Sequence, residues 1–318
     1  MSTLRRRLLP DSPLVHPVGL GCMGFSWAYE NSRAEPAVDV IRAALDAGAA
    51  HLDTSDIYGP FTNEEILGRA LRDGWRERAV VATKGGLATD GGVAGMRRDG
   101  RPEHITAACE ASLRRLGVDV IDLYYLHRVD ERVPVEETWG AMVELVRAGK
   151  VRALGISEAS VEQLDVVQGI HPVAVVQSEL SIWTRDRLHD VLPWCREHGT
   201  SFVAFAPLGR GFLTGAHGPE KVFDDDDFRS RLPRFTDEAR TANQVIVDGV
   251  SRIAQRHDLT PGQVALAWVL AQSEHVHVIP GTTRRQHLAQ NQAAAQVRLR
   301  AQDLDELAAL PEPVGSRY

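Results

Sequence analysis

The chain has 318 residues, and its 36 lysines and arginines against 43 aspartates and glutamates give a formal net charge of −7. This balance provides no basic face for nucleic acid, and no apolar run approaches the ~18 residues that span a membrane. Three cysteines that lie far apart, Cys22, Cys109 and Cys195, indicate neither a disulfide framework nor a zinc site. No stretch of signal-peptide length follows Arg5–Arg7, so we expect a cytoplasmic protein.

Short apolar runs alternate with longer amphipathic runs along the chain. The runs that predict strands are Val18–Gly21, Ala50–Asp53, Ala79–Thr83, Ile121–His127, Arg152–Ser157, Ala174–Glu179, Ser201–Ala206 and His275–Pro280. The runs that predict helices are Glu35–Ala47, Asn63–Leu71, Glu103–Leu116, Val135–Ala148, Val161–Gln168, Arg187–His198, Thr241–His257 and Gln286–Gln296. Several of the strand runs are continuous and rich in β-branched residues, which is typical of parallel strands covered on both faces.

Alternation of this kind predicts parallel βαβ units. Eight strands, with no dividing linker rich in Gly, Pro or Ser, predict one domain over residues 1–318, an α/β fold of the (β/α)8 TIM-barrel type. An open doubly wound sheet is the competing architecture. The irregular stretches Leu87–Arg101 and Gly209–Asp237 both follow a strand, so in a barrel both belong to the C-terminal rim, where active sites are built.

The segment GLGCMG at residues 19–24 matches the glycine pattern of a Rossmann dinucleotide-binding turn. That motif needs a buried strand before it and a helix that opens at once. The preceding segment is broken by Pro17, and no amphipathic run begins before about Glu35. The surroundings therefore argue against a Rossmann turn.

Ionisable residues stand at or just after the ends of three consecutive strands. Asp53 ends one strand and Tyr58 follows it by five residues, Lys84 comes at the end of the next, and His127 ends the one after. A buried ammonium needs a partner, and Asp53 on the neighbouring strand is the natural candidate for Lys84. Each residue alone has an ordinary structural explanation, such as a turn cap or a core histidine, but the four together predict an active site.

Seven segments spread along the chain from Gly19 to Asn291 form one pattern: GLGCMGFSWAY, HLDTSDIYG, NEEILGRAL, SLRRLGVDVIDLYYLH, GKVRALGISEAS, PLGRGFLTG and VIPGTTRRQHLAQN. Together they resemble the aldo-keto reductase superfamily, and most closely its bacterial and plant branch with GISEA and PGTT. The resemblance implies that GLGCMG forms the first barrel strand and its loop. It also implies an NADP(H)-dependent oxidoreductase that reduces aldehydes or ketones to alcohols.

The resemblance makes Asp53, Tyr58, Lys84 and His127 the catalytic tetrad. In carbonyl reduction, negative charge builds on the substrate oxygen, which then needs a proton. We expect Tyr58 to be the general acid, with Lys84 lowering its pKa and Asp53 holding Lys84 in place. We expect His127, as a neutral imidazole, to orient the carbonyl oxygen. This chemistry needs no metal.

The resemblance also implies a set of cofactor contacts. For the nicotinamide half they are Ser157 and Gln177 at the carboxamide, Phe205 under the ring, and Leu208, Arg210 and Gly211 along the pyrophosphate. For the adenosine half they are Gly281, Thr283, Arg284, Arg285, Gln290 and Asn291. Glu158 stands where many members have Asn, as in the branch named above, so we do not count it as a direct contact. Gly281 stands where many members have Lys, so the preference for NADP(H) depends more heavily on the two arginines beside a helix start. Paired arginines there can also be a solvated face.

Four aromatic residues from rim loops are candidates for the substrate pocket: Trp27, Tyr29, Phe61 and Trp183. An aromatic lining suits apolar carbonyl compounds, although some of these residues can instead plug the barrel mouth. The alternative function is a cofactor-bound regulatory protein with slow chemistry, which the same fold also serves in potassium-channel β subunits. The sequence fixes neither the physiological direction of the reaction nor the oligomeric state. The acidic run Asp224–Asp227 is expected to be a solvated loop rather than a metal site.

Overall fold

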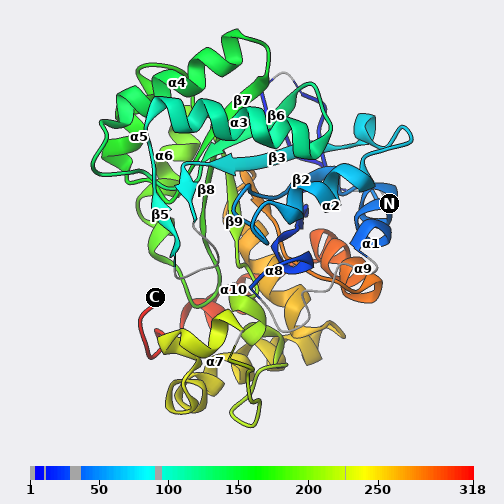
Figure 1. The fold of residues 1–318 in the computed structure, drawn as a ribbon. Helices are drawn as coiled ribbons and strands as arrows, with labels where there is room; N and C mark the ends of the chain where they lie inside the picture. The colour runs from blue at the N-terminus through cyan, green and yellow to red at the C-terminus, as the bar shows by residue number, and fades with distance from the viewer. Residues whose placement is uncertain (1–3, 11, 29–36, 90–94, 226) are drawn as a thin grey trace.

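The computed structural model describes residues 4–10, 12–28, 37–89, 95–225 and 227–318. Eight parallel strands form one curled sheet in the order β1-β2-β3-β6-β7-β8-β9-β10 (Figure 1). Their bounds are β1 Leu20–Gly21, β2 His51–Asp53, β3 Val80–Gly85, β6 Ile121–Leu126, β7 Val151–Ser157, β8 Val175–Glu179, β9 Ser201–Phe205 and β10 Val276–Val278. Each predicted strand therefore has an observed counterpart, shifted at its ends by a few residues.

Helices cover the outer face of this sheet (Figure 1). Their bounds are α1 Ala37–Asp46, α2 Thr62–Ala70, α3 Pro102–Leu116, α4 Val135–Arg147, α5 Val161–Gln168, α6 Val191–His198, α7 Asp237–Arg256, α8 Pro261–Ala271, α9 Arg285–Ala293 and α10 Ala301–Ala308. Strand and helix alternate along the chain, as the sequence predicts, and the fold belongs to the α/β class.

The two end strands of the sheet are joined to each other by backbone hydrogen bonds. The Gly19 N–H donates to the Val278 carbonyl at 2.9 Å, and the Val278 N–H donates to the Pro17 carbonyl at 2.9 Å. Parallel bridges also link Val18 to Val278 and Gly21 to Gly281. The first and last strands are therefore neighbours, as an eight-stranded barrel requires.

The strands are buried on both faces, and their side chains alternate between two clusters. Along β6, Tyr124 and Leu126 pack with helix residues, whereas Leu123 and Tyr125 join a second cluster that contains no residue of the helices. This alternation follows from the two-residue period of a strand. Gly155 on β7 makes room for the Tyr125 ring, because a Cβ atom there would lie 2.4 Å from Tyr125 Cδ1.

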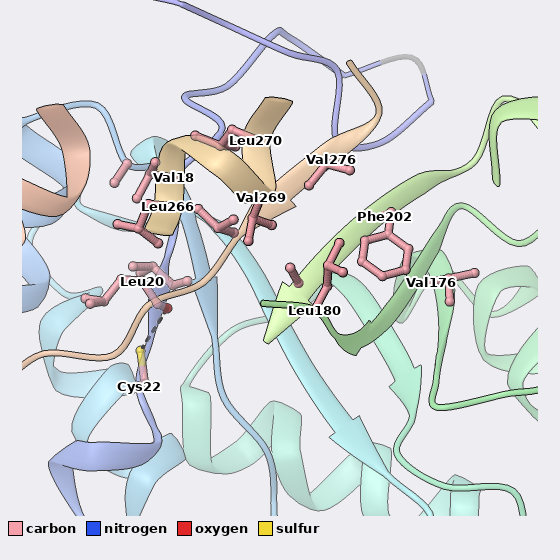
Figure 2. Close-up of a cluster of buried hydrophobic side chains, with 14 of the residues drawn as sticks. Val18, Leu20, Cys22, Val176, Leu180, Phe202, Leu266, Val269, Leu270 and Val276 are labelled. Atoms are coloured by element: carbon pink, nitrogen blue, oxygen red, sulfur yellow. Dashed lines mark hydrogen bonds between the residues drawn. The ribbon is translucent and has the colours of Figure 1, made fainter. Parts of the chain in front are cut away.

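Helix α8 is apolar on nearly every side and is buried from Val264 to Leu270. Leu266, Val269 and Leu270 lie close to residues of the first and last strands, including Val18 and Val276 (Figure 2). A capping box between Thr260 and Gln263 fixes its start. The helix was not predicted from sequence, because a helix that is buried all round has no amphipathic stripe.

Three further features differ from or complete the sequence-based expectation. The stretch Leu87–Arg101, predicted to be irregular, contains an antiparallel pair, β4 (Leu87–Ala88) with β5 (Arg97–Arg98). Helix α10 was also not predicted. The GLGCMG segment contributes β1 and a short 3-10 turn at Met23–Phe25 rather than a long helix, so the argument against a Rossmann turn is confirmed.

Among the described residues, no helix has the length and apolar character needed to cross a bilayer.

Candidate active site

The core of the site is an ion pair between Asp53, at the end of β2, and Lys84 on β3. The Lys84 ammonium donates to Asp53 Oδ1 at 2.5 Å and to the Thr54 carbonyl at 2.8 Å, and both side chains are almost completely buried. Asp53 Oδ2 accepts a hydrogen bond from Gln177 at 2.7 Å. Burial disfavours the ammonium, but Asp53 and Tyr58 together outweigh this effect and raise the pKa of Lys84. The lysine is therefore cationic at physiological pH.

Tyr58 lies over this pair, on the turn between β2 and α2. The Lys84 ammonium is 5.2 Å from the centre of the Tyr58 ring. Burial raises the pKa of Tyr58 above its usual value, although Lys84 and Arg128 act in the opposite direction. Lys84 thus acts in the direction that the sequence predicts, and burial acts more strongly in the opposite direction. Tyr58 holds its proton and is available as a donor.

His127 follows β6 and is held by its backbone N–H, which donates to the Gly85 carbonyl at 2.8 Å. Its ring meets the Tyr58 ring edge to face, with 6.0 Å between the centroids. Burial, with smaller effects from Arg128 and Lys84, keeps the pKa of His127 well below its usual value, so the imidazole is neutral. Its Nδ1 lies 3.1 Å from the Ser55 hydroxyl, a contact that the sequence did not reveal.

A cavity of about 1250 Å³ opens above these residues. Asp53, Tyr58 and His127 line it, while Lys84 lies behind them. Nine of the predicted cofactor residues also line it: Ser157, Gln177, Phe205, Leu208, Arg210, Gly211, Gly281, Thr283 and Arg284. The predicted residues that line this one cavity therefore come from or just after five strands and from three loops. The Ser157 hydroxyl accepts a hydrogen bond from Arg128 at 3.0 Å.

The loop after β9 carries Arg210 into the cavity. Gly209, Arg210 and Gly211 have φ angles of 57°, 55° and 94°, so an arginine occupies the left-handed region that favours glycine. One guanidinium nitrogen of Arg210 donates to Glu179 Oε2 at 2.9 Å, and the other, Nη1, is buried without a hydrogen-bond partner among the described residues. An unpartnered buried donor beside so large a cavity fits the diphosphate of a dinucleotide.

At the other end of the cavity, Arg284 immediately precedes α9 and lines the wall. Arg285 points elsewhere and lies 3.9 Å from Asp39 on the surface. Gln290 and Asn291 do not line the cavity, whereas His287, which the sequence did not suggest, does. The structure thus separates the two arginines that the sequence left equivalent.

The predicted substrate residues are not all brought together. Trp27 lines the cavity, and its ring is tilted against Tyr58 at 5.6 Å. Tyr29 lies outside the described residues. Phe61 is 46% exposed, and the Arg115 guanidinium lies over its ring. Trp183 is buried, with its ring centre 4.8 Å from that of Phe212. Neither residue reaches the cavity. Trp183 plugs the region below the Arg210 loop instead.

Asp227, the last residue of the acidic run, is buried and not solvated as the sequence predicted. Asp227 accepts hydrogen bonds from the backbone and guanidinium of Arg229 at 2.6 to 2.9 Å. Within the described residues, no group of three or more His, Cys, Asp or Glu side chains is arranged to hold a metal ion.

The sequence profile of the aldo/keto reductase family matches residues 17–312, nearly the whole chain. The chain belongs to the aldo-keto reductase family. This aldo-keto reductase is 42% identical over 308 residues to a probable aldo-keto reductase 1 of Glycine max, covering 96% of this chain and 88% of the soybean protein.

Solved structures of the family share the fold. A glycerol dehydrogenase of Gluconobacter oxydans superimposes with a TM-score of 0.88 at 31% identity, over 100% of this chain and 99% of its own. An aldo/keto reductase of Klebsiella pneumoniae, solved with NADP and acetate, superimposes with a TM-score of 0.73 at 27% identity, over 98% and 97% of the two chains. Membership places this chain among oxidoreductases that act on carbonyl compounds.

Proposed function

We propose that this aldo-keto reductase is an NADP(H)-dependent enzyme that reduces aldehydes and ketones to alcohols with Tyr58 as the general acid. The observation that carries this proposal is the buried Asp53–Lys84 pair directly behind a protonated Tyr58, beside a neutral His127, at the base of one cavity. When bound, the reduced nicotinamide supplies a hydride to the carbonyl carbon.

The residues of the chain do the remaining work. Tyr58 transfers its hydroxyl proton to the substrate oxygen as negative charge builds there, which completes the alcohol. Lys84 stabilises the resulting phenolate, because the ammonium lies close to the Tyr58 ring and is kept charged by Asp53. His127 donates a hydrogen bond to the same oxygen and fixes its position.

We assign the cofactor contacts as the sequence suggested, with one refinement. Ser157 and Gln177 hold the carboxamide, Phe205 stacks under the ring, and Leu208, Arg210 and Gly211 contact the pyrophosphate. Gly281, Thr283 and Arg284 hold the adenosine phosphate; Arg285, Gln290 and Asn291 are assigned a secondary role because they do not line the cavity. The NADP complex of the related Klebsiella pneumoniae protein supports this choice of cofactor.

The proposal includes the architecture: a single domain over residues 1–318 whose sheet closes into a (β/α)8 barrel. The hydrogen bonds between the end strands support closure. The substrates proposed are small carbonyl compounds with an apolar or aromatic group beside Trp27.

The test is NADPH consumption, followed by absorbance, against a panel of aldehydes and ketones. Tyr58→Phe should lower turnover by at least about 100-fold with unchanged NADPH affinity, because only the proton donor is removed. Tyr124→Phe is the matched control, since Tyr124 is buried in the core and does not line the cavity. NADPH binding without Tyr58-dependent turnover of any carbonyl would instead favour the regulatory function.

A further inference from the structure

The segment after α10 returns to the cavity and is fixed along the way. The Val314 N–H donates to Asn243 at 2.7 Å, and the Asn243 amide donates to the Val314 carbonyl at 3.0 Å. Arg234 donates to the Gly315 carbonyl at 3.2 Å. Gly315 has a φ of 92°, and a Cβ atom there would lie 2.9 Å from the Pro233 carbonyl oxygen. The chain therefore turns sharply here and carries Arg317 and Tyr318 to the cavity wall.

Arg317 enters between the partly buried carboxylate of Glu158 and the fully buried carboxylate of Glu179. Its Nη2 forms an ion pair with Glu158, and its Nε lies 3.1 Å from Glu179 Oε2. Glu179 Oε2 is shared with Arg210, so two carboxylates and two guanidinium groups form one cluster of zero net charge, which we call the Glu158–Arg317 cluster. Although burial disfavours a carboxylate, the Arg317 guanidinium lowers the pKa of Glu158, so this side chain is ionised.

Glu158 is held rigidly in this cluster. Its φ of 58° lies in the left-handed region, which costs free energy for a residue with a side chain. Its backbone N–H donates to the Gln177 carbonyl at 2.9 Å, and its Oε1 accepts from the Glu179 N–H at 2.9 Å. These two bonds and the Arg317 pair keep the carboxylate on the cavity wall, next to Ser157 and Gln177.

Arg317 also contacts the ring proposed to lie under the nicotinamide. Its guanidinium carbon is 5.8 Å from the centre of the Phe205 ring and 4.8 Å from that of Tyr318. The guanidinium carbon of Arg210 is 5.0 Å from the centre of the same Tyr318 ring. Arg317 and Tyr318 thus connect Phe205 to the loop that carries Arg210.

We propose that Arg317 is a positioning residue of the dinucleotide site, which neutralises and fixes the Glu158 carboxylate so that an anionic cofactor can occupy the cavity. The inference rests on the proposed function. A dinucleotide brings several negative charges into a partly buried space, where repulsion from an unpaired carboxylate is poorly screened. Because Glu158 brings a carboxylate to the cavity wall beside Ser157 and Gln177, it needs a cation at that place, and Arg317 supplies it.

The test compares titrations of the 318-residue chain with NADPH and with NADH, followed by quenching of tryptophan fluorescence. The melting temperature is recorded for each variant. Arg317→Met should raise the Kd for both dinucleotides by about tenfold or more, because the unpaired carboxylate lies beside the half that the two cofactors share. The double variant Glu158→Gln with Arg317→Met should recover most of the affinity, since a neutral amide needs no counter-ion. Arg317→Lys should be intermediate, because it keeps the charge and loses the fork.

Arg76→Met is the matched control. Arg76 pairs with the buried Asp122 at 2.8 Å and is similarly exposed, but it lies at the opposite end of the strands. It should lower the melting temperature without changing either Kd.

Each other outcome separates the two proposals. A wild-type chain that binds neither dinucleotide overturns the proposed function and this inference together. A wild type that binds, with an Arg317→Met variant that binds equally well, overturns only the inference. Tighter binding of the dinucleotides by Arg317→Met would show that the segment with Arg317 excludes the cofactor. An equal loss of affinity in the single and double variants would show that Arg317 does not act through Glu158. Either result overturns the inference.

Discussion

The Ser55 hydroxyl lies 3.1 Å from Nδ1 of His127, although 72 residues separate the two. The Ser55 oxygen is also 3.3 Å from the Lys84 carbonyl and 3.2 Å from Asp56 Oδ1. A neutral His127 can donate to a substrate from Nε2 only if Nδ1 is the acceptor. Ser55 satisfies this requirement when its proton is directed to Nδ1.

Ser55→Ala should therefore lower kcat by about tenfold and leave the NADPH Kd unchanged, because it removes the group that selects the His127 tautomer. Steady-state kinetics together with cofactor titration measure both quantities. Ser178→Ala serves as the control, because Ser178 is buried and its hydroxyl has no hydrogen-bond partner within the described residues. An unchanged kcat in Ser55→Ala would remove Ser55 from the mechanism.

Lys84→Met should abolish turnover and also destabilise the fold by about 3–5 kcal/mol, because it leaves the Asp53 carboxylate buried without its cation. Urea denaturation measures the free energy of unfolding. Adding Asp53→Asn to Lys84→Met should restore most of the stability and none of the turnover. If the double variant were as unstable as the single one, the ion pair would not be the source of the loss.

Arg284→Glu should weaken NADPH by about tenfold or more relative to NADH, because it replaces a guanidinium that lines the cavity. Arg285→Glu should have a much smaller effect, since Arg285 lies beside Asp39 on the surface. The ratio of the two Kd values in each variant is the measurement. The reverse order of effects would mean that Arg285 turns into the cavity to hold the phosphate.

The pH profile of carbonyl reduction should be flat between about pH 7 and pH 9. Burial raises the pKa of Tyr58, so the donor stays protonated over this range, and burial lowers the pKa of His127, so the imidazole stays neutral. Initial rates of kcat/KM at saturating NADPH measure the profile. An inflection close to pH 7 would show that one of these groups titrates there.

Stability should fall as the pH decreases below about 6.5, through two buried histidines that do not line the cavity. Burial lowers the pKa of His51 and of His277 to about 3 in the folded chain. Because the unfolded chain binds these protons at higher pH, each histidine removes about 1.4 kcal/mol of stability per pH unit between its two pKa values. His51→Phe should flatten this slope in urea denaturation at pH 7 and pH 5; an unchanged slope would exclude His51 as a source.

Local chemistry in the sequence was enough to predict the strands and the residues at their ends. Asp53, Lys84 and His127 stand directly at strand termini, and parallel strands bring such termini to one edge. Helix α8 was not predicted because it lacks a polar face. Phe61 and Trp183 were wrongly predicted to line the cavity, because the sequence does not show which way an aromatic side chain in a loop points. Ser55 and Arg317 were missed for another reason. Their roles depend on contacts with residues 72 and 159 positions away, which no local pattern records.

The close approach of Gly155 to the Tyr125 ring restricts which residues can replace either one in this sheet. A side chain at 155 and a large ring at 125 exclude each other, because the two would occupy the same space between neighbouring strands. Across a set of relatives, the two positions should therefore vary together: lineages that acquire alanine or serine at 155 should carry a smaller residue at 125. Substitutions inside the sheet would then occur at pairs of positions together rather than at single positions.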